Sequence, residues 1–212
     1  RVITNGAVTG RMTHQSPNMA QVPAVSAPFG TECRSCWTVD EGNKLVGIDA
    51  SGLELRMLAH YMDDEDYTNE ILNGDIHTAN QRAAQLSTRP LAKTFIYAFL
   101  YGAGDAKIGA IVGGNSVTGR RLKETFLSNT PSLERVRGDI HRQAVSGILD
   151  GLDGRKLRVR SEHAALNTLL QGAGAIVMKE ALTILNAKLL YIPHRFVANV
   201  HDEWQIETPA HY

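Results

Sequence analysis

Residues 45–56 read Leu-Val-Gly-Ile-Asp-Ala-Ser-Gly-Leu-Glu-Leu-Arg. The apolar run at the start predicts a short strand that ends at Asp49. Ala50-Ser51-Gly52 is then typical of a turn. Apolar residues recur at helical spacing from Leu53 to Met62, which predicts a helix. A strand followed directly by a turn and a helix places Asp49 where a side chain can extend beyond the edge of a sheet.

The flanking sequence continues this pattern with one group of helices and a second strand region. Further helices are predicted at about 76–86, 88–100, 104–112, 116–127, 131–149 and 164–190. Residues 1–30 and the acidic cluster 63–66 are interpreted as loop and solvated bend, and 156–159 as a strand. Residues 196–200 and 204–207 predict a β-hairpin around the polar tip His201-Asp202-Glu203. This order predicts one domain with a sheet and a helical insertion between its two halves.

Composition limits the classes of protein that fit. The chain has 212 residues, of which 43% are apolar and 21% charged, as in ordinary soluble domains. No run of about 18 apolar residues and no apolar leader occurs, so neither a membrane span nor a secretory signal is expected. Cys33 and Cys36 lack nearby zinc ligands and are expected to be reduced thiols, which fits a cytoplasmic protein. The first residue is not Met, and we expect the chain to be part of a longer protein.

Charge is distributed unevenly along the chain. The net charge is zero, yet residues 89–160 hold 13 basic and 6 acidic residues, a net of +7. A polyanion responds to the local field rather than to the total charge, so this segment favours a nucleic-acid partner. The alternative is chance clustering of charges on solvated faces.

The helix predicted over 88–101 carries a distinctive face. Arg89, Lys93, Tyr97 and Tyr101 are four residues apart, and each step advances about 40° around a helix, so all four share one slowly turning face. Two cations near a helix N-terminus oppose the helix dipole and repel each other, and no acid occurs between Ser87 and Gly104. A bound triphosphate would relieve them. The alternative is a solvated basic turn followed by two core tyrosines.

Asp49 and Asp202 are candidate metal ligands, one at the end of a strand and one at the tip of a hairpin. Magnesium prefers carboxylate oxygens, usually one or two together with substrate phosphates. If the two tips meet, they can hold two ions about 3.5–4 Å apart, the arrangement used for in-line phosphoryl displacement. The alternative for Asp202 is ordinary turn chemistry.

Three segments together resemble the motifs of family A DNA polymerases. Residues 49–56 resemble motif A, Arg89 through Gly102 resembles motif B, and residues 200–203 resemble motif C. Thr9-Gly10-Arg11 together with residues 17–23 is similar to the family segment that precedes motif A, and residues 74–78 are similar to a segment between motifs A and B. The similarity follows the family's order over nearly the whole chain. It is closest to the replicative polymerases of podovirus-like bacteriophages, especially across 44–112 and 151–175.

The resemblance implies a role for each matching residue. Asp49, the Ala50 carbonyl and Asp202 would hold two Mg²⁺ ions, with Asp49, Asp202 and Lys93 as the catalytic residues. The residues implied to contact the incoming nucleotide are Ala50, Gly52, Glu54, His77, Arg89, Lys93, Tyr97 and Tyr101. Among these, Glu54 would exclude a 2′-hydroxyl and Gly52 would form a tight turn. The residues implied to contact primer-template DNA are Arg11, Asn167, Gln171 and His201.

The resemblance also implies an architecture and partners. The fold class would be α+β: a polymerase palm, with a small antiparallel sheet backed by helices, formed by 1–72 and 151–212, and an inserted helical fingers subdomain at 73–150. The partners would be primer-template DNA, deoxynucleoside triphosphates and, for the full-length protein, a processivity factor. The family's upstream exonuclease and thumb regions and its last helix and strands have no counterpart here, and 128–150 is shorter than in the phage relatives.

Two other classes of protein share part of this pattern. A metal-dependent phosphodiesterase would use paired carboxylates but would not need Glu54 or the face formed by Arg89, Lys93, Tyr97 and Tyr101. A nucleic-acid-binding remnant without activity would keep the basic surface and lose a metal ligand, whereas Asp49 and Asp202 are both present.

Overall fold

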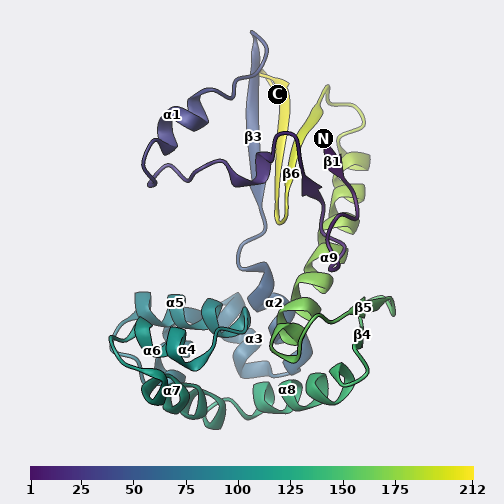
Figure 1. Ribbon diagram of the computed structural model, residues 1–212. Coiled ribbons are helices and arrows are strands. Elements are labelled where there is room, and N and C mark those ends of the chain that lie inside the picture. The colour runs from purple at the N-terminus through teal and green to yellow at the C-terminus, as the bar shows by residue number, and fades with distance from the viewer. The chain divides into compact units, whose positions relative to one another are not determined.

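The computed structural model describes residues 1–212, and the chain divides into two compact units (Figure 1). The first unit consists of Arg1–Leu53 and Gly172–Tyr212, and the second of Glu54–Gln171. The first unit is built on an antiparallel sheet and the second on helices, so the α+β class is confirmed.

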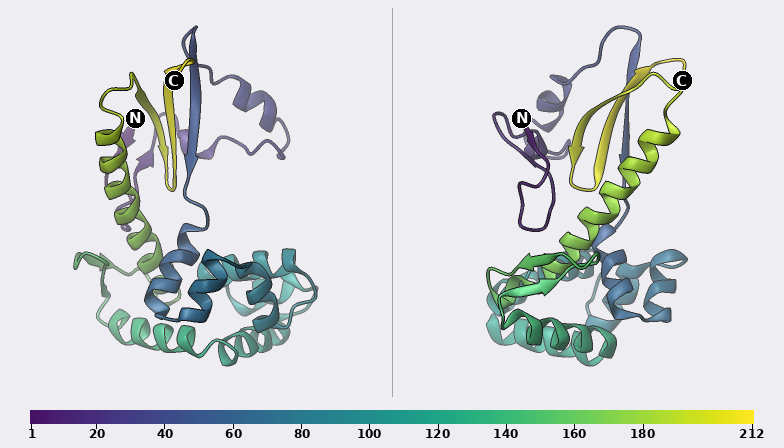
Figure 2. Two further views of the ribbon diagram at one scale, coloured as in Figure 1. Left: turned by 180° about the vertical axis from the view of Figure 1, so that it is seen from behind. Right: turned by 90° about the vertical axis from the view of Figure 1, so that its right-hand side faces the viewer.

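The main sheet of the first unit has three antiparallel strands in the order β3-β7-β6. Their bounds are Asn43–Asp49 for β3, Arg195–Val200 for β6 and Glu203–Pro209 for β7. β7 is the central strand, and its Trp204 and Ile206 are buried. β6 and β7 form the predicted hairpin, with a bulge between Phe196 and Ala198. Figure 2 shows the three strands from two further sides.

Residues 1–42 contribute short elements to the same unit. These are β1 (Val2–Ile3), β2 (Thr13–His14), the 3₁₀ turn η1 (Met19–Gln21) and α1 (Gly30–Ser35). The imidazole of His14 donates a hydrogen bond from Nε2 to the carbonyl oxygen of Asn199 (2.6 Å), which ties β2 to β6. The prediction of loop and turn for residues 1–30 missed both strands. Each strand has only two residues, which is too short to show an alternation of apolar and polar side chains.

The second unit is largely helical. Its helices are α2 (Leu53–Met62), α3 (Glu65–Leu72), α4 (Ile76–Ala84), α5 (Arg89–Leu100), α6 (Asp105–Ile111), α7 (Ser116–Ser128) and α8 (Pro131–Ala144), followed by β4 (Ile148–Asp150) and β5 (Lys156–Arg158). Packing of α4 on α5 and of α6 on α7 encloses a core of buried aromatic and aliphatic side chains. At its centre Phe95, Phe99 and Phe126 pack edge to face or tilted, with centroids 5.1–5.8 Å apart.

Two predicted boundaries were wrong. The acidic cluster 63–66 is the start of a helix rather than a solvated bend: Asp64 caps α3 by accepting from the Tyr67 amide (2.9 Å), and it also accepts from Ser132 (2.7 Å). The helix predicted over 131–149 ends at Ala144. Gly147 takes a positive φ of 75°, and β4 then pairs with β5, which buries Leu149 opposite Leu157.

α9 (Ala165–Lys188) begins in the second unit and continues in the first. With the preceding 3₁₀ turn η2 (Glu162–Ala164), it is long and apolar enough by length and composition to cross a membrane. Our expectation of no membrane span used an uninterrupted apolar run, which Asn167, Thr168 and Gln171 break. Core helices of soluble proteins meet the same criterion, so this one helix is weak support for a membrane span.

The aromatic centre of the second unit predicts a large and local stability effect. Phe126→Ala should lower the free energy of unfolding by about 3–5 kcal/mol, because Phe126 is fully buried and its removal leaves a cavity beside Phe95 and Phe99. Urea unfolding measures the change. Val117→Ala on the same helix is the control: Val117 is 73% exposed, and its truncation should change stability by less than about 0.5 kcal/mol.

Candidate active site

Pairing of β3 with β7 brings the two predicted metal ligands together in the main chain. Asp49 is the last residue of β3 and lies opposite Glu203 on β7. The amide of Ala50 donates to the carbonyl oxygen of Asp202 at 2.9 Å. Asp49 is exposed and Asp202 is half-buried. The two residues therefore occupy the same end of one sheet, and we predict that their carboxylates lie within about 6 Å of each other, close enough to share metal ions.

The donor set at this end of the sheet fits magnesium. No group of three or more His, Cys, Asp or Glu side chains in residues 1–212 could hold a metal ion by itself. Magnesium is usually held by one or two carboxylates and completes its shell with water and substrate phosphates. Asp49 and Asp202 supply two carboxylates on adjacent stretches of main chain. The Ala50 carbonyl, a further possible oxygen ligand, belongs to the residue that directly follows Asp49.

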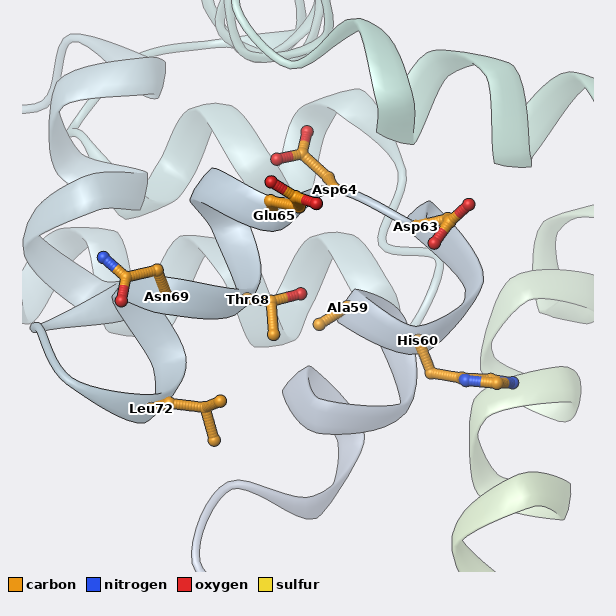
Figure 3. Close-up of a pocket in the computed structure, with 8 residues that line it drawn as sticks. All are labelled: Ala59, His60, Asp63, Asp64, Glu65, Thr68, Asn69 and Leu72. Carbon is orange, nitrogen blue, oxygen red and sulfur yellow. The ribbon is translucent and has the colours of Figure 1, made fainter.

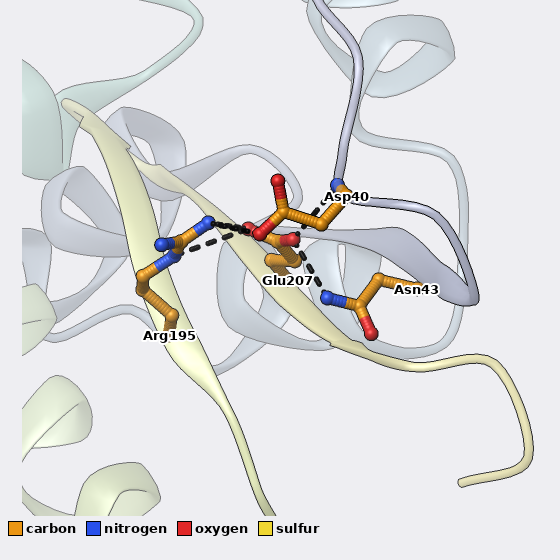
Figure 4. A network of polar contacts seen from close by, with 4 residues as sticks. All are labelled: Asp40, Asn43, Arg195 and Glu207. Carbon is orange, nitrogen blue, oxygen red and sulfur yellow. Dashed lines mark hydrogen bonds and ion pairs between the residues drawn. The ribbon is translucent and has the colours of Figure 1, made fainter.

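A polar network around the buried Glu207 carboxylate fixes the other end of the same sheet (Figure 4). The Glu207 carboxylate on β7 accepts from Asn43 Nδ2 on β3 (2.8 Å), from the Asp40 amide (3.1 Å) and from Arg195 Nε on β6 (3.1 Å). Arg195 also donates from Nη2 to Glu207 and, at 3.4 Å, to Asp40. Hydrogen bonds from Asn43 and Arg195 lower the pKa of Glu207 to about 2. The network joins all three strands and so opposes a slip in register, which would move Asp49 away from Asp202.

The predicted face of α5 is present in the second unit. Thr88 caps the helix by accepting from the Leu91 amide (3.4 Å), and Pro90 lies in the first turn. Arg89 and Lys93 are exposed, Tyr97 is half-buried against the core, and Tyr101 is 50% exposed. The alternative of two core tyrosines therefore does not hold for Tyr101.

Arg89 has an acidic partner that the sequence interpretation missed. Its guanidinium donates to both oxygens of Asp75, from Nε at 2.5 Å and from Nη2 at 3.0 Å. Asp75 also caps α4, since it accepts from the His77 amide (3.1 Å). An Asp directly before a helix is a recognisable cap signal, but the partner of Arg89 lies on another helix and no local spacing rule reveals it.

His77 lies beside this cation pair on α4. Burial, followed by the nearby charges of Arg89 and Lys93, lowers the pKa of His77, so the imidazole is neutral at physiological pH. Its ring centroid lies 6.2 Å from that of Tyr97, and its buried Nδ1 has no hydrogen-bond partner. The structure thus brings His77, Arg89, Lys93 and Tyr97 to one surface of α4 and α5.

Glu54 and Tyr101 meet within the second unit although they are far apart in sequence. Glu54 is in the first turn of α2, just after Gly52, whose φ is 62°. The Tyr101 hydroxyl at the end of α5 donates to Glu54 Oε1 at 3.4 Å. Glu54 is half-buried and so is not simply a solvated acid at a helix start.

The residues expected to contact DNA lie in both units. In the first unit, Arg11 is half-buried in a loop and His201 is exposed at the hairpin tip with a φ of 59°. In the second unit, Asn167 and Gln171 are one turn apart on α9 and half-buried. Gly172, the next residue of α9, is buried.

An open pocket on the surface contains none of the predicted site residues (Figure 3). It has a volume of about 400 Å³ and lies at the junction of α2 and α3. Asp63, Asp64 and Glu65 line it without any Lys or Arg, so it does not suit a phosphate group.

Comparison with known proteins defines the class. The family described as "DNA polymerase family A" matches residues 1–212, the whole chain. This protein therefore belongs to DNA polymerase family A.

The relatives include polymerases from phages and from bacteria. The chain is 47% and 48% identical to the DNA-directed DNA polymerases of Enterobacteria phage T3 and Escherichia phage T7, over 95% of its own length and 34% of theirs. It is 28% identical to the thermostable DNA polymerase I of Thermus thermophilus, over 95% of this chain and 27% of that protein. The chain thus spans about a third of the phage relatives it matches.

A solved structure shares the fold. The polymerase domain of Pol1 from M. smegmatis, in complex with a DNA primer-template and dNTP, matches 99% of this chain and 41% of its own. The TM-score is 0.87 at 24% sequence identity. The expected fold, a polymerase domain of mixed helix and small antiparallel sheet, is therefore confirmed.

The Glu207 network predicts a pH-dependent contribution to stability. A carboxylate whose folded pKa is lowered stabilises the fold above its unfolded pKa of about 4.3, and this contribution is lost as the pH falls toward about 2. Glu207→Gln should therefore lower the urea midpoint most at neutral pH, and the difference from the wild type should shrink below about pH 4. The exposed Glu41→Gln is the control and should show no such pH dependence. A difference that is constant with pH would assign the effect to shape rather than charge.

Proposed function

We propose that this chain is the catalytic core of a template-directed DNA polymerase, which adds deoxynucleoside triphosphates to the 3′ end of a primer during DNA replication. The observation that carries the proposal is the pairing of Asp49 with the hairpin that holds Asp202, in a chain that the family matches throughout. The cytoplasmic location and a processivity factor for the full-length protein belong to the same proposal.

Two Mg²⁺ ions are the proposed cofactors. Divalent metals are general in this family. Asp49, Asp202 and the Ala50 carbonyl would hold them, and bound metals stabilise the attacking and leaving oxygens of an in-line displacement. The contribution of the two aspartates is negative charge at a fixed place, set by the hydrogen bond between Ala50 and Asp202.

The incoming triphosphate would bind to the surface formed by α4 and α5. Arg89 offers several N–H groups in a planar fork, which suits phosphate oxygens, and Lys93 offers a compact charge. Lys93 would stabilise the charge that develops on the transferred phosphoryl group. His77 is neutral, so it would contribute a hydrogen bond rather than a charge.

The sugar and bases would be recognised by the aromatic and acidic residues of the second unit. Tyr97 would pack on the sugar and base of the nucleotide, and Tyr101 would lie beside the templating base. Glu54, held by the Tyr101 hydroxyl, would occupy the space that a 2′-hydroxyl needs. Arg11, Asn167, Gln171 and His201 would contact the primer-template. The first and second units would supply most of the palm and of the fingers, with the subdomain bounds at 72/73 and 150/151 kept as a prediction.

The metal proposal predicts a severe and specific loss of activity. Asp49→Asn and Asp202→Asn in the full-length protein keep the size of the side chain but remove the anion that holds magnesium. Primer extension with Mg²⁺ and deoxynucleotides should fall by about two orders of magnitude or more, with circular dichroism unchanged. Asp66→Asn, an exposed carboxylate in the first turn of α3, is the control. Near-normal extension by either aspartate variant would rule out the two-metal mechanism.

The role proposed for Glu54 predicts a change in sugar selectivity. Removing a carboxylate that fills the 2′ position should admit ribose, because its bulk and its desolvation no longer penalise the extra hydroxyl. Glu54→Ala should therefore lower the ratio of kcat/KM for deoxynucleotides over ribonucleotides by roughly tenfold or more.

Glu65→Ala is the matched control, because Glu65 is also an acid in the first turn of a helix, α3, and is not assigned to the site. If Glu54 only stabilises a helix N-terminus, both variants should leave selectivity unchanged.

A further inference from the structure

The contact between Asp75 and Arg89 is built from four hydrogen bonds on a single carboxylate. Oδ2 of Asp75 accepts from Arg89 Nε (2.5 Å) and Thr78 Oγ1 (2.7 Å), and Oδ1 accepts from Arg89 Nη2 (3.0 Å) and the His77 amide (3.1 Å). Two of these bonds anchor the carboxylate to the first turn of α4, and the other two hold the planar guanidinium at the start of α5. The carboxylate is therefore a rigid acceptor for Arg89.

The geometry leaves Arg89 able to bind a second anion. A guanidinium has five N–H groups, and Asp75 uses one on Nε and one on Nη2. The remaining three, two of them on Nη1, point away from the carboxylate because the fork is planar. Arg89 can thus donate to Asp75 and to a phosphate oxygen at the same time.

The stability of the fold gives little reason for this pair. The Arg89 side chain is 51% exposed and that of Asp75 is 40% exposed. Ion pairs this exposed contribute little to folding, because water and salt screen them. The pair instead favours anion binding by ordering the Arg89 side chain in advance. A free Arg89 would lose rotamer freedom on binding a phosphate, whereas Arg89 held by Asp75 has already lost it.

We propose that Asp75 is a positioning residue for the incoming nucleotide. It orients the Arg89 guanidinium toward the triphosphate, beside Lys93 and the neutral His77, without contacting the nucleotide itself. The proposal rests on the proposed function, in which Arg89 is a triphosphate ligand. Loss of the Asp75 charge should therefore weaken nucleotide binding even though a negative charge near the site is removed.

The test is steady-state primer extension by the full-length protein with the variant Asp75→Asn. Asn still caps α4, so the substitution removes the bidentate acceptor and spares the helix start. We expect KM for the deoxynucleotide to rise about two- to fivefold with kcat nearly unchanged. Glu70→Gln is the matched control, since it breaks another exposed ion pair, between Glu70 on α3 and Arg82 on α4 (3.0 Å), and should leave KM unchanged.

A double-mutant cycle separates positioning from a general structural effect. With Arg89→Ala as the background, Asp75→Asn should cause no further rise in KM, because the residue it orients is gone. A full additional rise would overturn the proposal. So would a fall in KM for Asp75→Asn alone, since Asp75 would then compete with the nucleotide for Arg89.

Calorimetric titration with inorganic triphosphate, without DNA, distinguishes this proposal from the proposed function. Asp75→Asn should weaken triphosphate binding by a similar factor, whereas Glu70→Gln should not. If the wild type fails to extend primers but this difference is found, the polymerase function is wrong and the positioning role stands. If the wild type extends primers and Asp75→Asn changes neither KM nor triphosphate affinity, the positioning role is wrong and the polymerase function stands.

Discussion

The structure of the candidate site depends on the antiparallel register between β3 and β7. Asp49 and Asp202 are more than 150 residues apart in the sequence, and a main-chain hydrogen bond from Ala50 to Asp202 makes them neighbours. A slip of one residue would turn the side chains of β3 to the opposite face and separate Asp49 from the hairpin tip. Two carboxylates can share metal ions only while this register holds.

Both units use the same device to fix a functional geometry: a carboxylate whose acceptor positions are all occupied. Glu207 is buried and joins three strands, and its pKa of about 2 shows how strongly its charged form is favoured. Asp75 is partly exposed and joins two helices. Burial makes the first a determinant of stability, whereas exposure leaves the second free to act on the placement of Arg89 rather than on folding.

Sequence reasoning recovered the parts of the fold that local patterns encode. The strand before Asp49, the helix after it and the hairpin around Asp202 all follow from hydrophobic period and turn chemistry. Short elements such as β4 were missed because their strands form only through pairing. The roles assigned to individual site residues came from family resemblance and stay predictions. Residue spacing alone also allowed purely structural roles, such as core packing or turn formation.

The charge of residues 89–160 shows why local patterns cannot settle electrostatics. The net of +7, which already counts six acidic residues, favoured a polyanion. Four of those acids, Asp105, Asp139, Asp150 and Asp153, form ion pairs with basic residues of the same segment. Those cations have partners a few residues away or on the adjacent helix. Arg89 differs, since its partner Asp75 comes from outside the segment and occupies only part of its fork. The ability of a cation to bind an anionic substrate therefore depends more on its unused N–H donors than on the sum of the charges around it. Those unused donors are the ones that its protein partner does not occupy.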